Sequence, residues 1–297
     1  MEVRSGRFAI LGDIQRTSHL EFWRESNTEE TRRLVVEIAA RRPDFVVGLG
    51  DFVFRGTSGR DWARVDALLA PIRDSDIPIL PILGNHEYWL SSRIALRNFF
   101  ESFPALAGRH WHADTYGALG LLFLDSNERE LGGDAWREQE AWLGETLARF
   151  DEDASVVGIL AFSHHPPYTN STVSGDALQV QRAFVPPFAA APKTLAMVSG
   201  HVHSFERFVR ADRTYLVAGG GGGPRVRLAR GASARHGDDL CEGPAVRPFH
   251  FLVCTPAGTG VEVEVVSLEK NARAFGTIAR FNLPWPRASF LPARGSA

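Results

Sequence analysis

The chain has 297 residues, of which 44% are hydrophobic, and its 33 lysines and arginines against 35 aspartates and glutamates give a formal net charge of -2. This is enough for one globular unit with a large core. The near-neutral charge gives no basic field for nucleic acid or anionic membranes, so we expect a small or medium substrate; the oligomeric state stays open. No stretch reaches the ~20 apolar residues that span a bilayer, and no export signal is apparent, so we expect a cytoplasmic protein.

Cys241 and Cys254 are the only two cysteines. Two are too few for a disulfide framework, and we expect reduced thiols.

The first third of the chain alternates apolar runs with amphipathic segments. Residues 8–12 and 44–50 each end in glycine and are followed by an aspartate, which is typical of buried strands that stop abruptly. Between them, Asn27 followed by Glu30 indicates a helix start, and helical spacing continues to residue 42. A second helix is expected over residues 62–72 and a strand over 77–83. This order predicts parallel strands whose carboxyl ends share one edge, where α/β sheets bind ligands.

The rest of the chain continues this pattern and then changes character. Helices are expected around residues 94–100, over 135–150 and from 178 to Pro186, and strands over 110–112, 120–125, 156–162 and 194–199, the first of them antiparallel. From Glu206 onward glycines and short strands dominate, and residues 249–254 and 261–268 are expected to form a second sheet. The glycine run 219–223 is interpreted as a turn, because it lacks the Lys-Ser/Thr of a phosphate-binding loop.

The loops after the predicted strands collect oxygen and imidazole donors. They hold Asp13, Gln15, Asp51, Asn85, His86, His164, His165, His201 and His203. Such mixed donors, without thiolates, suit Mn, Fe or Zn rather than a structural zinc site. The donors are too many for one ion, and an aspartate can bridge two. A pair of ions ~3.5 to 4 Å apart is the arrangement that clamps the attacking and leaving oxygens in phosphoryl hydrolysis.

Five motifs, in order, resemble the calcineurin-like metallophosphoesterases. They are Gly12-Asp13, Gly50-Asp51, GNHE at Gly84, His-x-Pro-x-Tyr at His164 and Gly-His-x-His at Gly200. The strings HHPPY from His164 and GHVHSFERF from Gly200 are similar to the loops of the purple acid phosphatase-like branch. The similarity covers roughly residues 7–270. It implies an α/β fold, a four-layer α/β/β/α sandwich, with a catalytic domain over residues 1–270 and a C-terminal strand and loosely attached tail over 271–297.

The resemblance also implies a division of the ligands between two divalent or mixed-valence ions, Mn, Fe or Zn. Asp13 and His203 would bind the first metal, Asn85, His164 and His201 would bind the second, and Asp51 would bridge them.

A metal-bound hydroxide would then attack the phosphorus of a phosphate ester in line. His86 would face the substrate and stabilise the transition state or protonate the leaving alkoxide.

Two residues depart from the family pattern. Gln15 stands where many members have histidine, and because an amide oxygen is a weaker ligand than imidazole, the first metal is held less tightly or Gln15 lies outside its ligand set. Phe54 stands where purple members carry a tyrosine, so the iron-phenolate ligand and its colour should be missing.

The remaining candidates have more ordinary interpretations. His165 is expected to pack or to support a ligand, His19 to lie in a solvated loop, and Tyr168 to pack. His110, His112 and His250 are expected to be ordinary strand histidines, and Glu87 and Glu206 to anchor loops through salt bridges.

Two alternatives to a phosphomonoesterase stay open. One is a phosphodiesterase, and the other is a binding domain that keeps the fold without catalysis. The retained His86 and the full ligand set argue against the second, because a binding module needs no proton donor.

Overall fold

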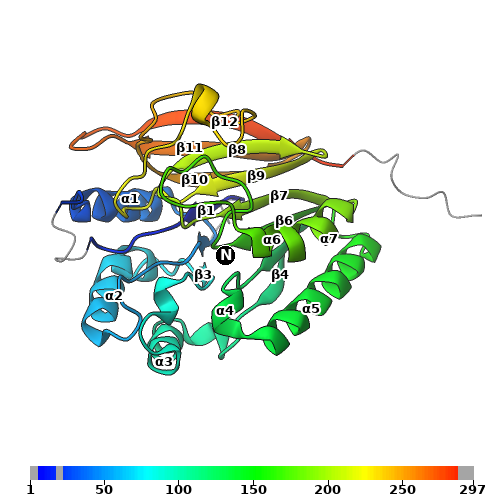
Figure 1. The fold of residues 1–297 in the computed structure, drawn as a ribbon, viewed down its shortest axis with the longest axis horizontal. Coiled ribbons are helices and arrows are strands. Elements are labelled where there is room, and N and C mark those ends of the chain that lie inside the picture. The colour runs from blue at the N-terminus through cyan, green and yellow to red at the C-terminus, as the bar shows by residue number, and fades with distance from the viewer. Residues whose placement is uncertain (1–5, 18–22, 287–297) are drawn as a thin grey trace, which may run out of the picture.

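Two six-stranded sheets form the centre of the protein in this computed structural model, which describes residues 6–17 and 23–286. In Figure 1, helices α1 to α3 gather on the left of the sheets and helices α4 to α7 on the lower right. Of the predicted C-terminal strand and tail over residues 271–297, the strand is present as Gly276–Pro284, whereas residues 287–297 and His19 lie outside the described residues.

The first sheet combines the parallel strands of the first third of the chain with three antiparallel strands from its end. Across the sheet the strands are β12 (Gly276–Pro284), β11 (Gly260–Leu268), β10 (Phe249–Ala257), β1 (Phe8–Leu11), β2 (Val46–Gly48) and β3 (Ile79–Pro81). β1, β2 and β3 are parallel, as predicted, whereas β10 joins β1 in antiparallel register.

The second sheet comes from the middle of the chain. Across the sheet the strands are β4 (His112–Tyr116), β5 (Leu119–Phe123), β6 (Gly158–Ser163), β7 (Thr194–Ser199), β9 (Arg213–Ala218) and β8 (Phe205–Arg210). The four inner strands are parallel, and β4 and β8 are antiparallel edges. The prediction that residues 249–254 and 261–268 form the second sheet is therefore wrong, because β10 and β11 extend the first.

Alternation along β1 shows how the layers assemble. Phe8 and Ile10 point into the core between the two sheets, whereas Ala9 and Leu11 point to the core beneath the first group of helices. Such a strand is buried on both faces, which explains its continuous apolar sequence. A third core lies on the outer face of the second sheet. The predicted four-layer α/β/β/α sandwich is confirmed.

Three helices cover the outer face of the first sheet, and three other helices cover the outer face of the second. The first group is α1 (Thr28–Arg41), α2 (Gly59–Arg73) and α3 (Ser92–Ser102). The second is α5 (Gly133–Glu152), α6 (Leu178–Ala183) and α7 (Val185–Ala190), with the single turn α4 (Glu128–Leu131) before α5. Short 3-10 turns occupy His86–Tyr88 (η2), Pro104–Leu106 (η3) and Gly231–Ser233 (η4).

Three local predictions need correction. The helix from residue 178 ends at Ala183, before Pro186, and this proline instead lies in the first turn of α7, where its missing N–H costs no hydrogen bond. Asn27 precedes α1 but makes no capping hydrogen bond with its side chain, and the carboxylate of Glu30 instead contacts Lys270, 3.0 Å from Nζ. β4 begins at His112, so His110 lies before the strand.

Cys241 and Cys254 are both buried and unpaired, as expected for reduced thiols. Among the described residues, no helix has both the length and the apolar surface to cross a membrane.

Candidate metal centre

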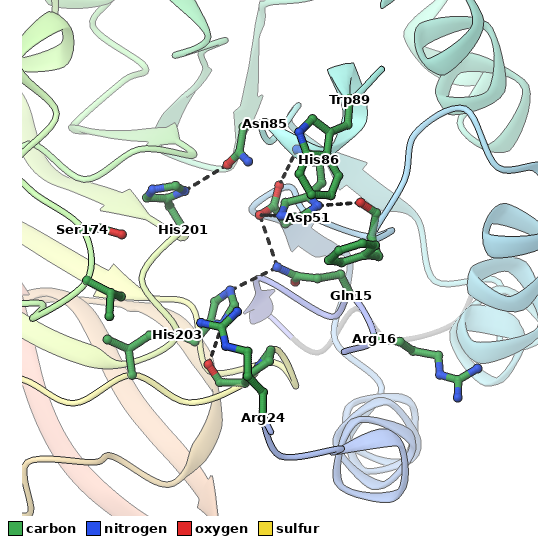
Figure 2. A pocket seen from close by; sticks show the side chains of 14 residues that line it. Gln15, Arg16, Arg24, Asp51, Asn85, His86, Trp89, Ser174, His201 and His203 are labelled. Carbon is green, nitrogen blue, oxygen red and sulfur yellow. Dashed lines mark hydrogen bonds and ion pairs between the residues drawn. The ribbon is translucent and has the colours of Figure 1, made fainter. Parts of the chain in front are cut away.

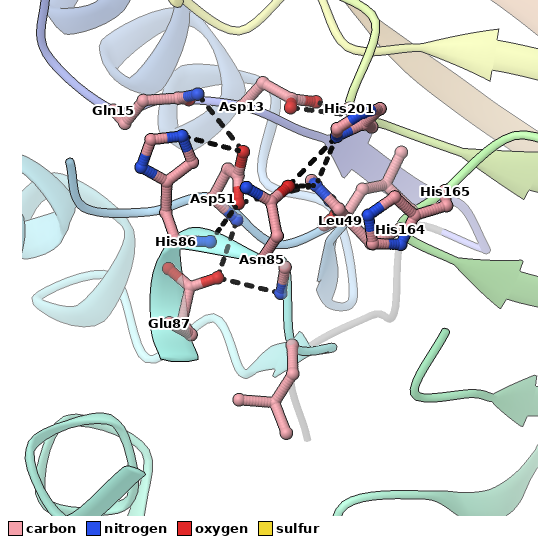
Figure 3. A network of polar contacts seen from close by, with 12 residues as sticks. Asp13, Gln15, Leu49, Asp51, Asn85, His86, Glu87, His164, His165 and His201 are labelled. Carbon is pink, nitrogen blue, oxygen red and sulfur yellow. Dashed lines mark hydrogen bonds and ion pairs between the residues drawn. The ribbon is translucent and has the colours of Figure 1, made fainter. Parts of the chain in front are cut away.

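The predicted donors from both sheets meet at one point (Figure 3). Asp13 follows β1 and Asp51 follows β2, while His164 and His201 follow β6 and β7 of the second sheet. Donor atoms of Asp13, Asp51 and His164 lie within 4.8 Å of one another, and these three side chains are buried. Carboxylates from one sheet and imidazoles from the other therefore share a single buried site.

Three residues of this site have a left-handed backbone although none is glycine. Their φ values are 60° for Asp13, 52° for Asp51 and 64° for His201. Residues with a Cβ rarely adopt this conformation, and it persists only where the surroundings fix it. Here the amide of Asp13 donates to the Gly50 carbonyl at 3.1 Å, and the amide of His201 donates to the carboxylate of Asp13 at 2.9 and 3.0 Å. The strained turns thus hold one another in place.

Glu87 fixes the loop that carries Asn85 and His86. Its carboxylate is buried and accepts hydrogen bonds from the amides of Gly84 and Asp51, each at 2.8 Å, and of Phe52 at 2.9 Å. Burial and the nearby Asp51 raise the pKa of Glu87 to about 7. The anchoring role was predicted, but the partners are backbone amides rather than the cation of a salt bridge.

Gly84 is required at the close approach of this loop to Asp51. A Cβ at this position would lie 2.3 Å from Oδ1 and 2.4 Å from the amide nitrogen of Asp51. The first residue of GNHE is thus a steric necessity.

One half of the centre is built around the Asn85 oxygen. His164 Nδ1 donates to the Leu49 carbonyl at 2.7 Å, so its Nε2 faces Asn85 Oδ1 at 3.1 Å. His201 Nδ1 approaches the same oxygen at 3.0 Å. His165 lies behind them, with its ring 4.5 Å from that of His201 and its Nδ1 2.9 Å from the Ser126 hydroxyl.

The other half is built around Gln15 and His203. His203 Nδ1 donates to the Pro224 carbonyl at 2.8 Å, which leaves Nε2 as an acceptor facing the site. Gln15 Nε2 donates to that nitrogen at 3.1 Å and to Asp51 Oδ2 at 3.3 Å, so the amide lies between these two side chains. Gln15 Oε1 is buried and has no hydrogen-bond partner among the described residues.

The electrostatics of the cluster indicate a place for cations. Burial raises the pKa of Asp13 well above its ordinary value. Burial would do the same to Asp51, but the imidazoles of His164 and His86 keep its pKa below the ordinary range. Burial opposes charge on His164, yet the two carboxylates raise its pKa to about 10. Asp51 thus holds a proton on His164, as expected where buried carboxylates need positive charge.

The other two imidazoles are neutral. Burial and the nearby His164 lower the pKa of His201 to about 3, and burial lowers the pKa of His203 to about 4. Neutral imidazoles with a fixed tautomer, next to carboxylates and an amide oxygen with a free lone pair, form a suitable ligand set for a divalent first-row metal.

His86 lies at the edge of the cluster and faces a pocket (Figure 2). Its Nδ1 donates to the Phe54 carbonyl at 2.6 Å, so Nε2 is left for the pocket side, 3.8 Å from Asp51 Oδ2. Phe54, in the place of the expected tyrosine, offers a ring without a hydroxyl and packs 5.3 Å from the imidazole of His86.

The glycine run 219–223 supports the centre, which the prediction of a simple turn missed. Gly221 donates its amide to the Gly12 carbonyl at 2.8 Å, and Gly223 donates to the Asp13 carbonyl at 2.7 Å. A Cβ on Gly223 would lie 2.5 Å from the ring of His203. The only available signal was the length of the glycine run directly after a strand.

The remaining candidates do not enter the cluster. Glu206 is buried and accepts from the Thr169 hydroxyl at 2.5 Å and the Asn170 amide at 2.6 Å, so it anchors a loop without a cation as its partner. Tyr168 packs against the guanidinium of Arg210, whose Cζ is 3.8 Å from the ring centroid.

The three histidines predicted to lie in strands contact core groups. His110 Nδ1 lies 3.2 Å from Asp125, the ring of His112 stacks on Phe123, and His250 is buried in β10.

We predict that Glu87→Gln destabilises the protein by about 1–3 kcal/mol, because the new NH2 group would face an amide donor and leave it unsatisfied. Urea unfolding followed by circular dichroism measures this change. Glu29→Gln is the matched control, since the side chain of Glu29 is 63% exposed. Equal stability of the two variants would contradict the anchoring role.

Comparisons with known proteins place this site in a family. The family model described as calcineurin-like phosphoesterase matches residues 6–205, and no curated protein matches the chain. The fold is similar to that of GAP50, the anchor in the inner membrane complex of Plasmodium, with a TM-score of 0.66, 16% identity, and coverage of 95% of this chain and 89% of that one.

Two phosphatases also share the fold. The purple acid phosphatase PPD1 from yellow lupin (Lupinus luteus) seeds has a TM-score of 0.65 at 17% identity; the match covers 88% of this chain but only 51% of the lupin chain. A dimetal phosphatase from Danio rerio has a TM-score of 0.62 at 15% identity, with 92% and 98% covered. Since the family model matches more than half of the chain and its strand-end motifs form the centre described above, the chain belongs to the calcineurin-like phosphoesterase family.

Proposed function

We propose that the protein hydrolyses phosphate esters with the help of two metal ions bound at the strand-end cluster. The observation that carries the proposal is the position of Asp51, whose carboxylate lies 3.4 Å from His164 Nε2 on one side and 3.3 Å from Gln15 Nε2 on the other. One carboxylate between two sets of candidate donors is what a bridged pair of ions requires.

The donors divide into two groups that suit Mn, Fe or Zn. Asp13, His203 and Gln15 would hold one ion, and Asn85, His164 and His201 the other, with Asp51 shared. When bound, the ions supply Lewis-acid activation of water and neutralise charge on the phosphoryl group. The buried and unpartnered Gln15 Oε1 is consistent with an amide that rotates toward a cation.

His86 is the proton donor in this proposal. The hydrogen bond from Nδ1 to the Phe54 carbonyl orients the ring of His86. In the doubly protonated imidazolium form, the second proton is on Nε2 and faces the pocket. From there Nε2 donates to the leaving oxygen of the ester as its bond to phosphorus breaks.

The proposal covers both phosphomonoesters and phosphodiesters. The alternative is a binding protein without catalysis. The Plasmodium protein of similar fold is described as an anchor, so the fold by itself does not imply catalysis. The retained His86 favours the enzyme. A cytoplasmic location and a catalytic domain over residues 1–270 are further proposals, and they rest on the sequence alone.

We expect the protein reconstituted with Mn²⁺ or Zn²⁺ to bind close to two ions per chain, measured by elemental analysis after dialysis. Asp51→Asn should lose both ions together, because the bridging charge is removed. Asp134→Asn, at a fully exposed position, is the control. A limit of one ion per chain at saturating metal would refute the dinuclear centre.

His86→Ala should keep its metal and fold while turnover falls by a factor on the order of 10² to 10⁴, as for the loss of a general acid. Steady-state kinetics with esters of increasing leaving-group acidity measure the effect. The loss should shrink for good leaving groups, which need no proton. A constant loss across the series would instead assign His86 a positioning role.

The ion beside Gln15 should be the weaker and more exchangeable one, so titration of metal into the metal-free protein should give two unequal steps, with activity appearing only at the second. Gln15→His should tighten the weak step, since imidazole is the better donor to first-row ions. Unchanged steps in Gln15→His would show that residue 15 is not a ligand.

In the native chain, iron loading should produce no phenolate charge-transfer band, because Phe54 has no hydroxyl.

A further inference from the structure

The pocket above the cluster has a volume of about 200 Å³. This is below the ~300 to 1,000 Å³ of sites that enclose drug-sized ligands. Part of its lining is the metal cluster, so the remaining space fits a phosphoryl group and one compact substituent. A dinucleotide or a folded protein partner would extend beyond it.

One wall of the pocket is an aromatic group that is already rigid. Trp89 packs edge to face with His86 at 4.7 Å and with Phe54 at 5.0 Å between ring centroids. Even so, Trp89 is 44% exposed and lines the pocket. Because its two neighbours fix the indole, stacking a ligand ring on it costs little ordering of the side chain.

In Figure 2, Ser174 lies across the pocket from Trp89, and Val173, the residue before it in the chain, also lines the pocket. Their loop is held by the Ser171 hydroxyl, which accepts from the amides of Val173 at 3.2 Å and Ser174 at 3.0 Å. Val173 is 67% exposed although it is apolar. Two exposed apolar side chains on fixed supports thus border the pocket, and a ligand ring between them would remove their apolar surface from water.

A positive charge lies at the third side of the pocket. Arg24 lines it, and Figure 2 shows its side chain rising toward His203, whereas Arg16 points away from the cluster. The backbone next to Arg24 is fixed because Glu25 pairs with Arg225 at 2.9 Å. Arg24 also has a contact of its own within the protein, but a guanidinium has five N–H donors, so it suits a second anionic group of a ligand bound beside the cluster.

We propose that the pocket selects phosphate esters whose alcohol carries one aromatic ring and a second anionic group, with the ring between Trp89 and Val173 and the anion on Arg24. This inference rests on the proposed phosphoesterase function. It also assigns Trp89 and Arg24 as specificity residues that bind the ligand and exchange no proton or bond with it.

Binding of phosphonates, which cannot be hydrolysed, tests the inference without turnover. Calorimetry would compare methylphosphonate, benzylphosphonate and 4-carboxybenzylphosphonate on the Mn²⁺-equilibrated protein. We expect benzylphosphonate to bind about 10-fold tighter than methylphosphonate, in the range of one stacked ring. The carboxylate should add roughly 3- to 10-fold, as a partly exposed charge pair does.

Each gain should disappear in one variant. Trp89→Ala should make methyl- and benzylphosphonate bind alike, and Arg24→Gln should remove only the gain from the carboxylate. Two matched controls should keep both gains: Leu90→Ala, at a side chain that is 78% exposed beside Trp89, and Arg129→Gln, at an exposed arginine of α4.

Parallel kinetics with ethyl phosphate and benzyl phosphate separate the two proposals. Hydrolysis of both esters, with three phosphonates that bind equally or not at all, would overturn the inference and leave the phosphoesterase function intact. Selective phosphonate binding without hydrolysis of any ester would support the ligand class and overturn the enzymatic proposal.

Discussion

The buried carboxylate of Asp51 is the point on which the rest of the site depends. It lies at the end of β2 with an exposed fraction of 2% and accepts a hydrogen bond from the amide of His86 at 3.0 Å. Its other contacts are the amide of Gln15 and the imidazole of His164 from the second sheet. A carboxylate removed from water needs positive charge or several donors around it. The carboxylates of Asp51 and Asp13 raise the pKa of His164 to about 10, so this imidazole supplies positive charge when protonated, and the same arrangement would accept metal ions.

Packing of the two sheets makes this concentration of charge possible. The core between them contains large apolar side chains from both sheets, such as Phe8 and Phe162, which are fully buried. This core fixes the relative position of the strand ends, and the strand ends fix the ligands. Left-handed backbone at Asp13, Asp51 and His201 costs of order 1–3 kcal/mol at each position. The packed scaffold offsets this strain, and it positions each candidate ligand without a bound ion.

Much of the centre could be predicted because its information is local. Each candidate ligand stands shortly after an apolar run, and parallel strands bring such positions to one edge. The supporting contacts could not be predicted in this way. Asn27 donates to the carbonyls of Gly222 and Gly223, which are 195 and 196 residues away in the sequence. Likewise, β10 pairs with β1 across almost the whole chain, so the sheet it joins was assigned wrongly. In both cases the residues next to each partner in the sequence give no indication of the distant contact.

Phe54 connects the chemical part of the site to its outer wall. Its carbonyl accepts the Nδ1 proton of His86, and its ring packs against Trp89, which in turn packs against the imidazole. The phenylalanine that removes a potential metal ligand therefore contributes a third ring to an aromatic cluster around the proposed proton donor. A ligand ring on Trp89 would press on the same cluster that orients His86. Because packed side chains transmit small displacements, the choice of substrate and the placement of the proton would be coupled through these three rings.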